Sequence, residues 1–338
     1  MTPKLAAARY GKDNVRVYKV HRNEETGVHT VVEMTVCVLL EGDIETSYTK
    51  ADNSVVVATD SMKNTIYIMA KLHPVTPPEL FASILGSHFT TTYPHIHTAH
   101  VDIVTLRWTR MTFDGKPHPH SFLRDGTETR NVSATISEGN SGSKDITSLT
   151  STISLTSSIS GLSVLKSTNS QFHNFIRDEY TTLPETWDRV LSTNVDANWK
   201  WQPFTSVDAV KRAVPQFDET WRAARDITLR TFAQDNSASV QNSMYKMAEQ
   251  ILAVQPLLET VEYSLPNNHY FELDLSWHKG LKNTGKNAEV YVPQSGPNGL
   301  IKCKKLHTSC YEFFAMFLNL RGYTRGSQVP VAILNVSQ

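Results

Sequence analysis

The sequence has few cysteines, and none of them form a pair at metal-binding spacing. Its 338 residues include three cysteines, Cys37, Cys303 and Cys310, and no C-x-x-C motif. A disulfide framework is therefore not expected, and a reducing compartment fits this composition. No run of about 18 apolar residues occurs, so no membrane span is predicted. The N-terminus MTPKLAAARYGK lacks the apolar core of a secretory signal.

The chain also lacks net charge. Lysine plus arginine and aspartate plus glutamate both total 33, so the formal net charge is zero. Proteins that bind nucleic acids or anionic membranes carry a basic excess, so neither partner is expected. A Gly-rich phosphate loop, a nucleophile elbow and a zinc-protease helix are missing too. With 40% hydrophobic residues, the chain can form two globular domains or one large one.

The first half predicts the order strand, strand, helix, helix, strand, strand. TVVEMTVCVLLEG stops at the turn signal Gly42-Asp43, and DIETSYTKADNSVVVATD follows as its predicted partner strand. SMKNTIYIMAKL and PPELFASILGSHF predict helices, the second beginning at a proline pair. HVDIVTLRWTRM and HPHSFLRD have the composition of strands.

The second half repeats this order, with strands in GLSVLKSTNSQFHNF and WDRVLSTNVDANWKW and two helices after them. The first helix has a predicted stripe of Phe217, Trp221, Ala224, Thr228 and Thr231. The second has a stripe of Val240, Met244, Met247, Ile251 and Val254, in which we interpret the methionines as core residues. LLETVEYSL and YFELDLSWHKG predict the last two strands. Two ββααββ units indicate an α+β protein whose antiparallel sheets carry helices on one face.

Composition predicts four parts: a first module over residues 1–138, a connection over 139–161, a second module over 162–303 and an atypical tail over 304–338. The Ser/Thr-rich connection is most simply flexible, although its Ile/Leu spacing also suits a short strand or hairpin. FFAMFLNL in the tail is too short to span a bilayer. It could be a docking helix, a genuine extension, or a translated non-coding or frame-shifted stretch.

The predicted strand after Pro266 carries polar residues on an apolar face. Alternation places Asn267 and His269 on the same side as the apolar set Phe271, Leu273, Leu275 and Trp277. Spacing alone leaves two interpretations open, a strand end whose polar groups meet water or a loop carbonyl, and a functional edge.

Lys12, Thr59 and Asp60 stand at element boundaries. Lys12 lies just before the alternating strand VRVYKV and, taken alone, is a solvated lysine. Thr59 and Asp60 lie where a strand gives way to a helix, whose free N–H groups suit anionic or polar acceptors. The simpler interpretation of that junction is an N-cap by Asp60 or Ser61.

Histidines cluster in HIHTAH and HPH, which contain His95, His97, His100, His118 and His120. Histidines at such spacing can bind a metal. Neither group has a well-placed cysteine or carboxylate partner in the sequence, so a metal site is not the preferred interpretation.

Taken in order, seven motifs of the chain resemble uricase (urate oxidase), most closely the fungal type. They are ARYGKDNVRVYKV, TKADNSVVVATDSMKNT, HPHSFLRD, STNSQF, RDEYTTLPETWDR, DNSASVQNSMYKMAEQ and YSLPNNHYFELDLSWHKG, within roughly residues 8 to 303. The resemblance implies the tunnelling fold (T-fold), a tandem pair of ββααββ modules. It also implies a homotetramer in which paired subunits close a barrel around a tunnel, with active sites at subunit interfaces.

The resemblance implies that urate, O2 and water give 5-hydroxyisourate and hydrogen peroxide, in purine degradation, without a metal or an organic cofactor. Lys12 and Thr59 match the catalytic pair and His269 its partner histidine. The residues that match substrate-binding positions are Thr59, Asp60, Phe172, Arg189, Val240, Gln241 and Asn267. Among these, Arg189 and Gln241 match the residues that bind urate through their side chains, and Phe172 matches the aromatic residue that stacks on it. Asp60 and Val240 match residues that contact urate through the main chain. Asn267 matches the residue beside the oxygen or water site.

These assignments suit the chemistry of urate. A planar guanidinium offers parallel donors to its amide edge, a glutamine amide supplies donor and acceptor, and an aromatic ring stacks on its plane. Deprotonated urate can pass electrons to O2 itself, so the protein must remove a proton and stabilise charge in a dry site. A lysine acts as a base only where its pKa is lowered from about 10.4. A Lys12–Thr59–His269 relay could move protons, which makes the polar strand start a functional edge.

Two features depart from the family. The Ser/Thr-rich stretch is longer than usual, and the chain ends NVSQ, whereas fungal uricases commonly end in the peroxisomal signal Ser-Lys-Leu. A peroxisomal location is expected for the family but is not supported by that signal here, and a cytoplasmic one is the other expectation. Two alternative functions stay open, a metal-dependent purine or pterin enzyme of the same fold that uses the HIHTAH histidines, and a non-catalytic purine-binding assembly.

Overall fold

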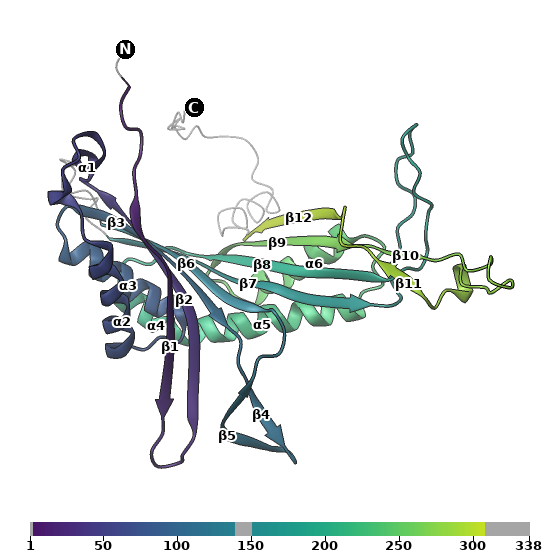
Figure 1. Cartoon of the computed structure of the whole chain (residues 1–338), viewed down its shortest axis with the longest axis horizontal. Coiled ribbons are helices and arrows are strands. Elements are labelled where there is room, and N and C mark those ends of the chain that lie inside the picture. The colour runs from purple at the N-terminus through teal and green to yellow at the C-terminus, as the bar shows by residue number, and fades with distance from the viewer. Residues whose placement is uncertain (1–2, 139–150, 308–338) are drawn as a thin grey trace, which may run out of the picture.

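The computed structural model describes residues 3–138 and 151–307 of the chain (Figure 1). One antiparallel sheet of eight strands runs through both halves. In spatial order its strands are β1 (Tyr10–Arg22), β2 (His29–Gly42), β3 (Ile96–Leu106), β6 (Thr129–Ser137), β7 (Thr152–Lys166), β8 (Leu191–Trp201), β9 (Leu258–Asn268) and β12 (Gly299–Leu306). Two small hairpins stand outside it, β4 (Thr109–Phe113) with β5 (Lys116–Leu123), and β10 (Tyr270–Glu272) with β11 (Tyr291–Pro293).

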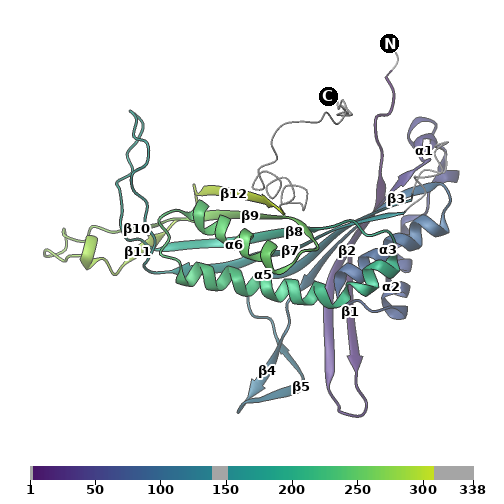
Figure 2. The ribbon, with the colours of Figure 1, turned by 180° about the vertical axis from the view of Figure 1, so that it is seen from behind.

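The main helices lie on one face of this sheet, as the two opposite views show (Figures 1 and 2). They are α2 (Thr59–Leu72), α3 (Pro78–Thr92), α4 (Val207–Arg212), α5 (Val214–Gln234) and α6 (Val240–Val254). Helix α2 packs on β1, α3 on β3 and β6, α5 on β7, and α6 on β9 and β12. Each half therefore has the predicted order of two strands, helices and two strands, and the α+β class is confirmed.

The core lies between the sheet and the helices. In β2 the buried side chains alternate with half-buried ones because successive residues of a strand point to opposite faces. In α6 the predicted stripe is buried from Val240 to Ile251, but Val254 is 56% exposed because the helix ends there. In α5 the fully buried row is Phe217, Thr220, Ala224, Thr228 and Phe232, so Trp221 and Thr231 were wrongly placed in its centre.

The predicted strand DIETSYTKADNSVVVATD is wrong. This segment forms the short helix α1 (Glu45–Thr49) and a 3-10 turn (Asn53–Val55), and β2 pairs with β1 and β3 instead. Short polar side chains satisfy the backbone locally, because the Ser47 hydroxyl donates to the Ile44 carbonyl and Asp52 accepts from the Ser54 N–H. Such local bonds compete with a strand ladder.

The predicted strand YFELDLSWHKG is also wrong beyond its first residues. Strand β10 has only three residues and pairs with β11, while β12 is the last strand of the sheet. The expected apolar face is open, with Trp277 79% exposed. A turn stops the strand, since Asp274 accepts from the Ser276 N–H and the Asn283 amide donates to the Leu273 carbonyl.

Strand limits differ from the composition-based parts at three places. Strand β7 begins at Thr152, within the predicted connection over residues 139–161. The second part of this Ser/Thr-rich stretch is therefore a strand, which was the alternative to a flexible connection. Its residues Ile153 and Leu155 belong to the core. The same strand stops at Lys166 and leaves the STNSQF segment outside the sheet. Strand β12 continues past the predicted module end at Cys303 to Leu306. The predicted docking helix FFAMFLNL and the chain end lie outside the described residues.

Within residues 3–138 and 151–307, no helix combines the length and the apolar character that a membrane crossing requires.

A buried ionic cluster ties the two halves together. The Arg130 guanidinium of β6 donates to Glu79 of α3 at 3.0 Å and to Asp218 of α5 at 2.6 Å. The Glu79 side chain is 0% exposed and also accepts from the Ser157 hydroxyl at 2.7 Å. Removing one partner of a buried ion pair leaves the other charge buried without a counter-ion, so breaking this cluster lowers the free energy of unfolding.

Glu79→Gln keeps the shape of the side chain and removes its charge. We expect the free energy of unfolding to fall by about 3 kcal/mol, because Arg130 then loses a buried counter-ion. Urea denaturation at matched protein concentration, followed by tryptophan fluorescence, measures this loss. Asp208→Asn is the control, since the Asp208–Lys211 pair is exposed and its loss is expected to leave the midpoint unchanged. Equal midpoints for wild type and Glu79→Gln would contradict the role of the cluster.

Candidate functional site

Lys12 lies inside β1, immediately before a bulge, and not ahead of the strand as the sequence predicted. The register with β2 shifts between Lys12 and Val15, and Asn14 takes a left-handed φ of 56°, which asparagine tolerates. At Gly11 a Cβ would come within 1.8 Å of the Val38 carbonyl oxygen, so only glycine lets β1 approach β2 here. The bulge and the glycine fix the position of Lys12 at the edge of the sheet.

Thr59 and Asp60 form the first turn of α2, next to the start of β1. The N-cap is Ala58, without a side-chain cap, so the predicted cap by Asp60 or Ser61 is wrong. Asp60 instead accepts from Lys63 at 2.6 Å, and this bond, together with the nearby Lys12 charge, lowers the pKa of Asp60. The Tyr10 hydroxyl accepts from the Val57 N–H at 2.6 Å and ties the approach of α2 to β1.

Four other candidates line one cleft in the second half. Phe172, Arg189, Asn267 and His269 border about 730 Å³ of open space. The Arg189 guanidinium lies 5.3 Å from the centre of the Phe172 ring, a cation–π contact that orients both groups. Burial lowers the pKa of Arg189, although an arginine remains charged at neutral pH. The His269 ring stacks on Phe271 at 6.0 Å, just after β9 ends.

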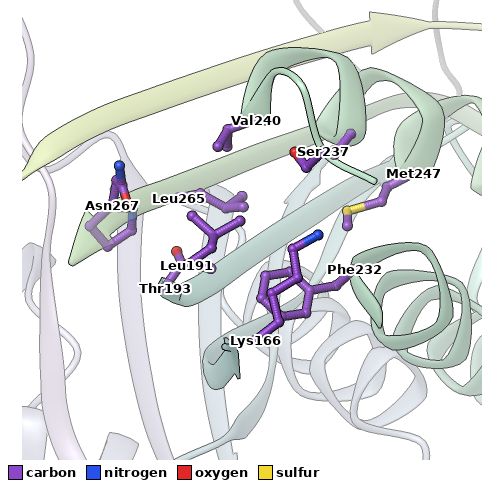
Figure 3. A pocket seen from close by; sticks show the side chains of 11 residues that line it. Lys166, Leu191, Thr193, Phe232, Ser237, Val240, Met247, Leu265 and Asn267 are labelled. Atoms are coloured by element: carbon purple, nitrogen blue, oxygen red, sulfur yellow. Dashed lines mark hydrogen bonds between the residues drawn. The ribbon is translucent and has the colours of Figure 1, made fainter. Parts of the chain in front are cut away.

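Val240 and Gln241 occupy the first turn of α6 and are not among the residues that line this cleft. Ser239 caps the helix by accepting from the Asn242 N–H at 3.4 Å, which leaves Gln241 exposed and Val240 buried. Val240 and Asn267 line a second, smaller cavity (Figure 3).

Asp235, which the sequence did not single out, holds these elements together. Its carboxylate accepts from Lys246 at 2.8 Å and from the Ser243 hydroxyl at 2.5 Å. The Ser243 hydroxyl also contacts the Ser237 hydroxyl at 2.9 Å, and Ser237 forms a backbone bridge with Ser170, two residues before Phe172. In the sequence, Asp235 opens the motif DNSASVQNSMYKMAEQ and lies between a predicted helix and the next helix start, and these two signals could have found it.

The structure does not bring all candidates together. Six strand-to-strand steps separate β1 from β9 in the sheet, about 29 Å along it at about 4.8 Å a step. Figure 1 shows β1 and β10 at different ends of the molecule. Lys12, Thr59 and Asp60 thus form one group and the remaining candidates another, so the predicted Lys12–Thr59–His269 relay does not exist within one chain.

The histidines of HIHTAH are engaged individually. His97 pairs with Asp43 at 3.1 Å and His100 with Glu41 at 2.9 Å, so carboxylate partners exist that the sequence did not indicate. His95 contacts the Val55 carbonyl at 3.0 Å. Over residues 3–138 and 151–307, no group of three or more His, Cys, Asp or Glu side chains is arranged to hold a metal ion.

Comparisons with known proteins agree on one family. Residues 8–135 and 155–302 match the sequence model of the Uricase family. A uricase of Aspergillus flavus is 71% identical over 299 residues, which are 88% of this chain and 95% of the relative. A uricase of Schizosaccharomyces pombe is 45% identical over 294 residues, 87% of this chain and 95% of the relative. The crystal structure of the uricase from Arthrobacter globiformis superposes with a TM-score of 0.76 at 34% identity and covers 90% of this chain and 96% of its own.

Asp235→Asn tests the link between the Phe172 segment and α6. Burial raises the pKa of Asp235, but the bonds from Lys246 and Ser243 outweigh it, so the pKa lies below 3.8. A carboxylate with a lowered pKa stabilises the fold above its unfolded pKa, and this contribution is lost as pH falls through the folded value. The variant should therefore melt below wild type at pH 7, and the gap should close toward pH 3. Thermal unfolding across this range, with exposed Asp208→Asn as control, measures it. A gap independent of pH would contradict this assignment.

Proposed function

The chain belongs to the uricase family and is a urate oxidase, and we propose that two copies of the chain build each of its active sites. The observation that carries the proposal is the separation of the two residue groups along the sheet. The Lys12, Thr59 and Asp60 group lies by β1, and the Phe172, Arg189 and Asn267 group lines an open cleft.

A two-fold related pair satisfies this geometry. In an isologous interface the β1 end of each copy meets the cleft end of the other, so one pair forms two equal sites. Large apolar side chains that line the cleft support such a contact, because Phe271, Trp187 and Leu183 are exposed in the single chain. The sheet face without helices is the surface that closing a barrel would cover (Figures 1 and 2). Two such pairs give the homotetramer that the family resemblance implies.

Binding of urate follows from the cleft residues. Arg189 offers two parallel N–H donors to the amide edge, and its contact with Phe172 places that edge beside a stacking ring. Gln241, at the exposed start of α6, supplies a donor and an acceptor to the opposite edge. The partner's Thr59 and Asp60 bring the N-terminus of α2, where backbone N–H groups lack helical acceptors, to the remaining oxygen atoms.

Oxidation then requires proton handling and no group beyond the substrates. Urate gives two electrons to O2, one water adds its hydroxyl to the ring, and two protons leave with the reduced oxygen as hydrogen peroxide. One urate, one O2 and one water thus balance one 5-hydroxyisourate and one peroxide. The partner's Lys12 and the partner's Thr59 with His269 form the proton relay across the interface. Asn267 holds O2 and then the attacking water against the ring.

Cofactor-free oxidation predicts equal consumption of urate and O2 when excess chelator is present. Urate absorbance and dissolved oxygen, followed together in the purified protein, should fall one to one while peroxide appears. Loss of both signals on chelation, with recovery on adding a metal, would favour the metal-dependent alternative. Urate binding without oxygen uptake would favour the non-catalytic one.

Shared active sites predict complementation between two inactive variants. Lys12→Ala and Arg189→Ala should each lose activity, since each removes one half of every site. After mixed refolding, half of the pairs are hybrids with one intact site in two, so about a quarter of wild-type activity should return. Lys12→Ala mixed with Thr59→Ala is the matched control, because both changes lie in the same half. No recovery from the first mixture would place the complete site within one chain.

A further inference from the structure

A small cavity lies behind Asn267, on the protein side of the proposed oxygen site. It is lined by side chains of β7, β8, β9 and the first turns of α6, among them Lys166, Thr193, Val240 and Leu265 (Figure 3). Its volume of about 10 Å³ is at the lower limit of what one water molecule needs. The space is therefore enough for a single water molecule and too small for urate.

Thr193 has a buried hydroxyl at this cavity. The residue is 3% exposed, and its Oγ1 has no hydrogen-bond partner among residues 3–138 and 151–307. A buried unpaired hydroxyl costs free energy, whereas a valine fills the same volume without that cost. We therefore expect the Thr193 hydroxyl to form a hydrogen bond in the assembled enzyme.

Asn267 is the polar group best placed to be that partner. Thr193 in β8 is directly opposite Asn267 in β9, and opposite residues of an antiparallel pair share one face of the sheet. Both side chains border the cavity. The Asn267 amide makes no hydrogen bond to another residue of the described part, so its orientation is not fixed by the protein alone.

Lys166 provides a hydrogen-bond donor to the cavity. Its ammonium has three donors and no acceptor, and one donor binds the Asp235 carbonyl at 2.8 Å. Figure 3 shows its nitrogen directed toward the cavity. A water that accepts from Lys166 must direct its own hydrogens to acceptors. Ser237 and Ser243 also line the cavity, but their hydroxyls bond to each other and Ser243 donates to Asp235. The remaining polar acceptors of the lining are Thr193 Oγ1 and Asn267 Oδ1.

We propose that Thr193 is a positioning residue that orients the Asn267 amide through one buried water molecule. The water donates to Asn267 Oδ1, so the amide turns its N–H donors toward the reacting oxygen. Peroxide, which accumulates negative charge as O2 is reduced, then meets donors and not a carbonyl oxygen. This inference rests on the role proposed for Asn267.

The test compares Thr193→Val with Thr193→Ser in the assembled enzyme. Loss of one bridging hydrogen bond should lower kcat/KM for O2 about three- to tenfold in Thr193→Val. The KM for urate should stay unchanged, and Thr193→Ser should recover activity to within about twofold. The thermal midpoint of Thr193→Val should stay close to that of wild type, because the valine keeps the side-chain volume and only one hydrogen bond to the buried water is lost. A structural role alone would not separate oxygen use from stability in this way.

Thr105→Val is the matched control, since Thr105 in β3 also has a buried, unpaired hydroxyl but lies in the other half of the sheet. It should leave the kinetics unchanged. Equal kinetics for Thr193→Val and wild type, or equal losses in the Val and Ser variants, would overturn the inference. If Thr193→Val does not fold, a high-resolution crystal structure of the wild type decides by the presence or absence of water between Thr193 and Asn267.

Asn267→Ala separates the inference from the function on which it rests. If Asn267→Ala lowers kcat/KM for O2 and Thr193→Val does not, the proposed site stands and the positioning role falls. If Asn267→Ala leaves oxygen use unchanged, the role of Asn267 falls and the positioning role falls with it, although urate oxidation itself remains.

Discussion

The backbone pairing of β6 with β7 determines the rest of the architecture. Thr129 to Ser137 pair in continuous register with Thr152 to Ser160, so two four-stranded units become one eight-stranded sheet. The Arg130 cluster reinforces the same junction from the helix side, because it joins α3 to α5. One continuous sheet places its first and last strands at opposite edges. The site that we propose takes residues from both ends of this sheet, and it therefore requires a second copy of the chain.

Local patterns allowed much of the fold to be predicted. Alternation in β2 and β8 and the helical spacing of Val240, Met244, Met247 and Ile251 correspond to the observed core. These elements bury a regular face, and each buried apolar side chain contributes about 1.5–3 kcal/mol. The predictions failed where the pattern was regular but no partner strand was available. YFELDLSW alternates like a strand, yet beyond Glu272 it pairs with no strand among residues 3–138 and 151–307 and turns away. A local pattern does not show which distant segment of the sequence a strand will pair with.

The site was predictable as residue types and not as geometry. Lys12, Thr59, Arg189 and Asn267 were found through motif resemblance, whereas their division between two edges follows from strand order. Asp235 opens the motif DNSASVQNSMYKMAEQ, but its role was not predicted, because that role comes from the Ser243 and Lys246 side chains that the fold brings to its carboxylate. Thr193 resembles any strand threonine in sequence. Only its burial and its register opposite Asn267 distinguish it.

The polar start of the predicted strand lies at the end of β9, and the proposed function assigns roles to two of its residues. Asn267 is still within β9, paired on both sides by Thr193 of β8 and Gly299 of β12, and so has little freedom. His269 comes after the last residue of β9, where the chain leaves the sheet, and its ring stacks on Phe271 of β10. A group that orients oxygen needs a fixed position, and a group that passes protons across an interface needs room to adjust to the partner. The end of one strand provides both within three residues.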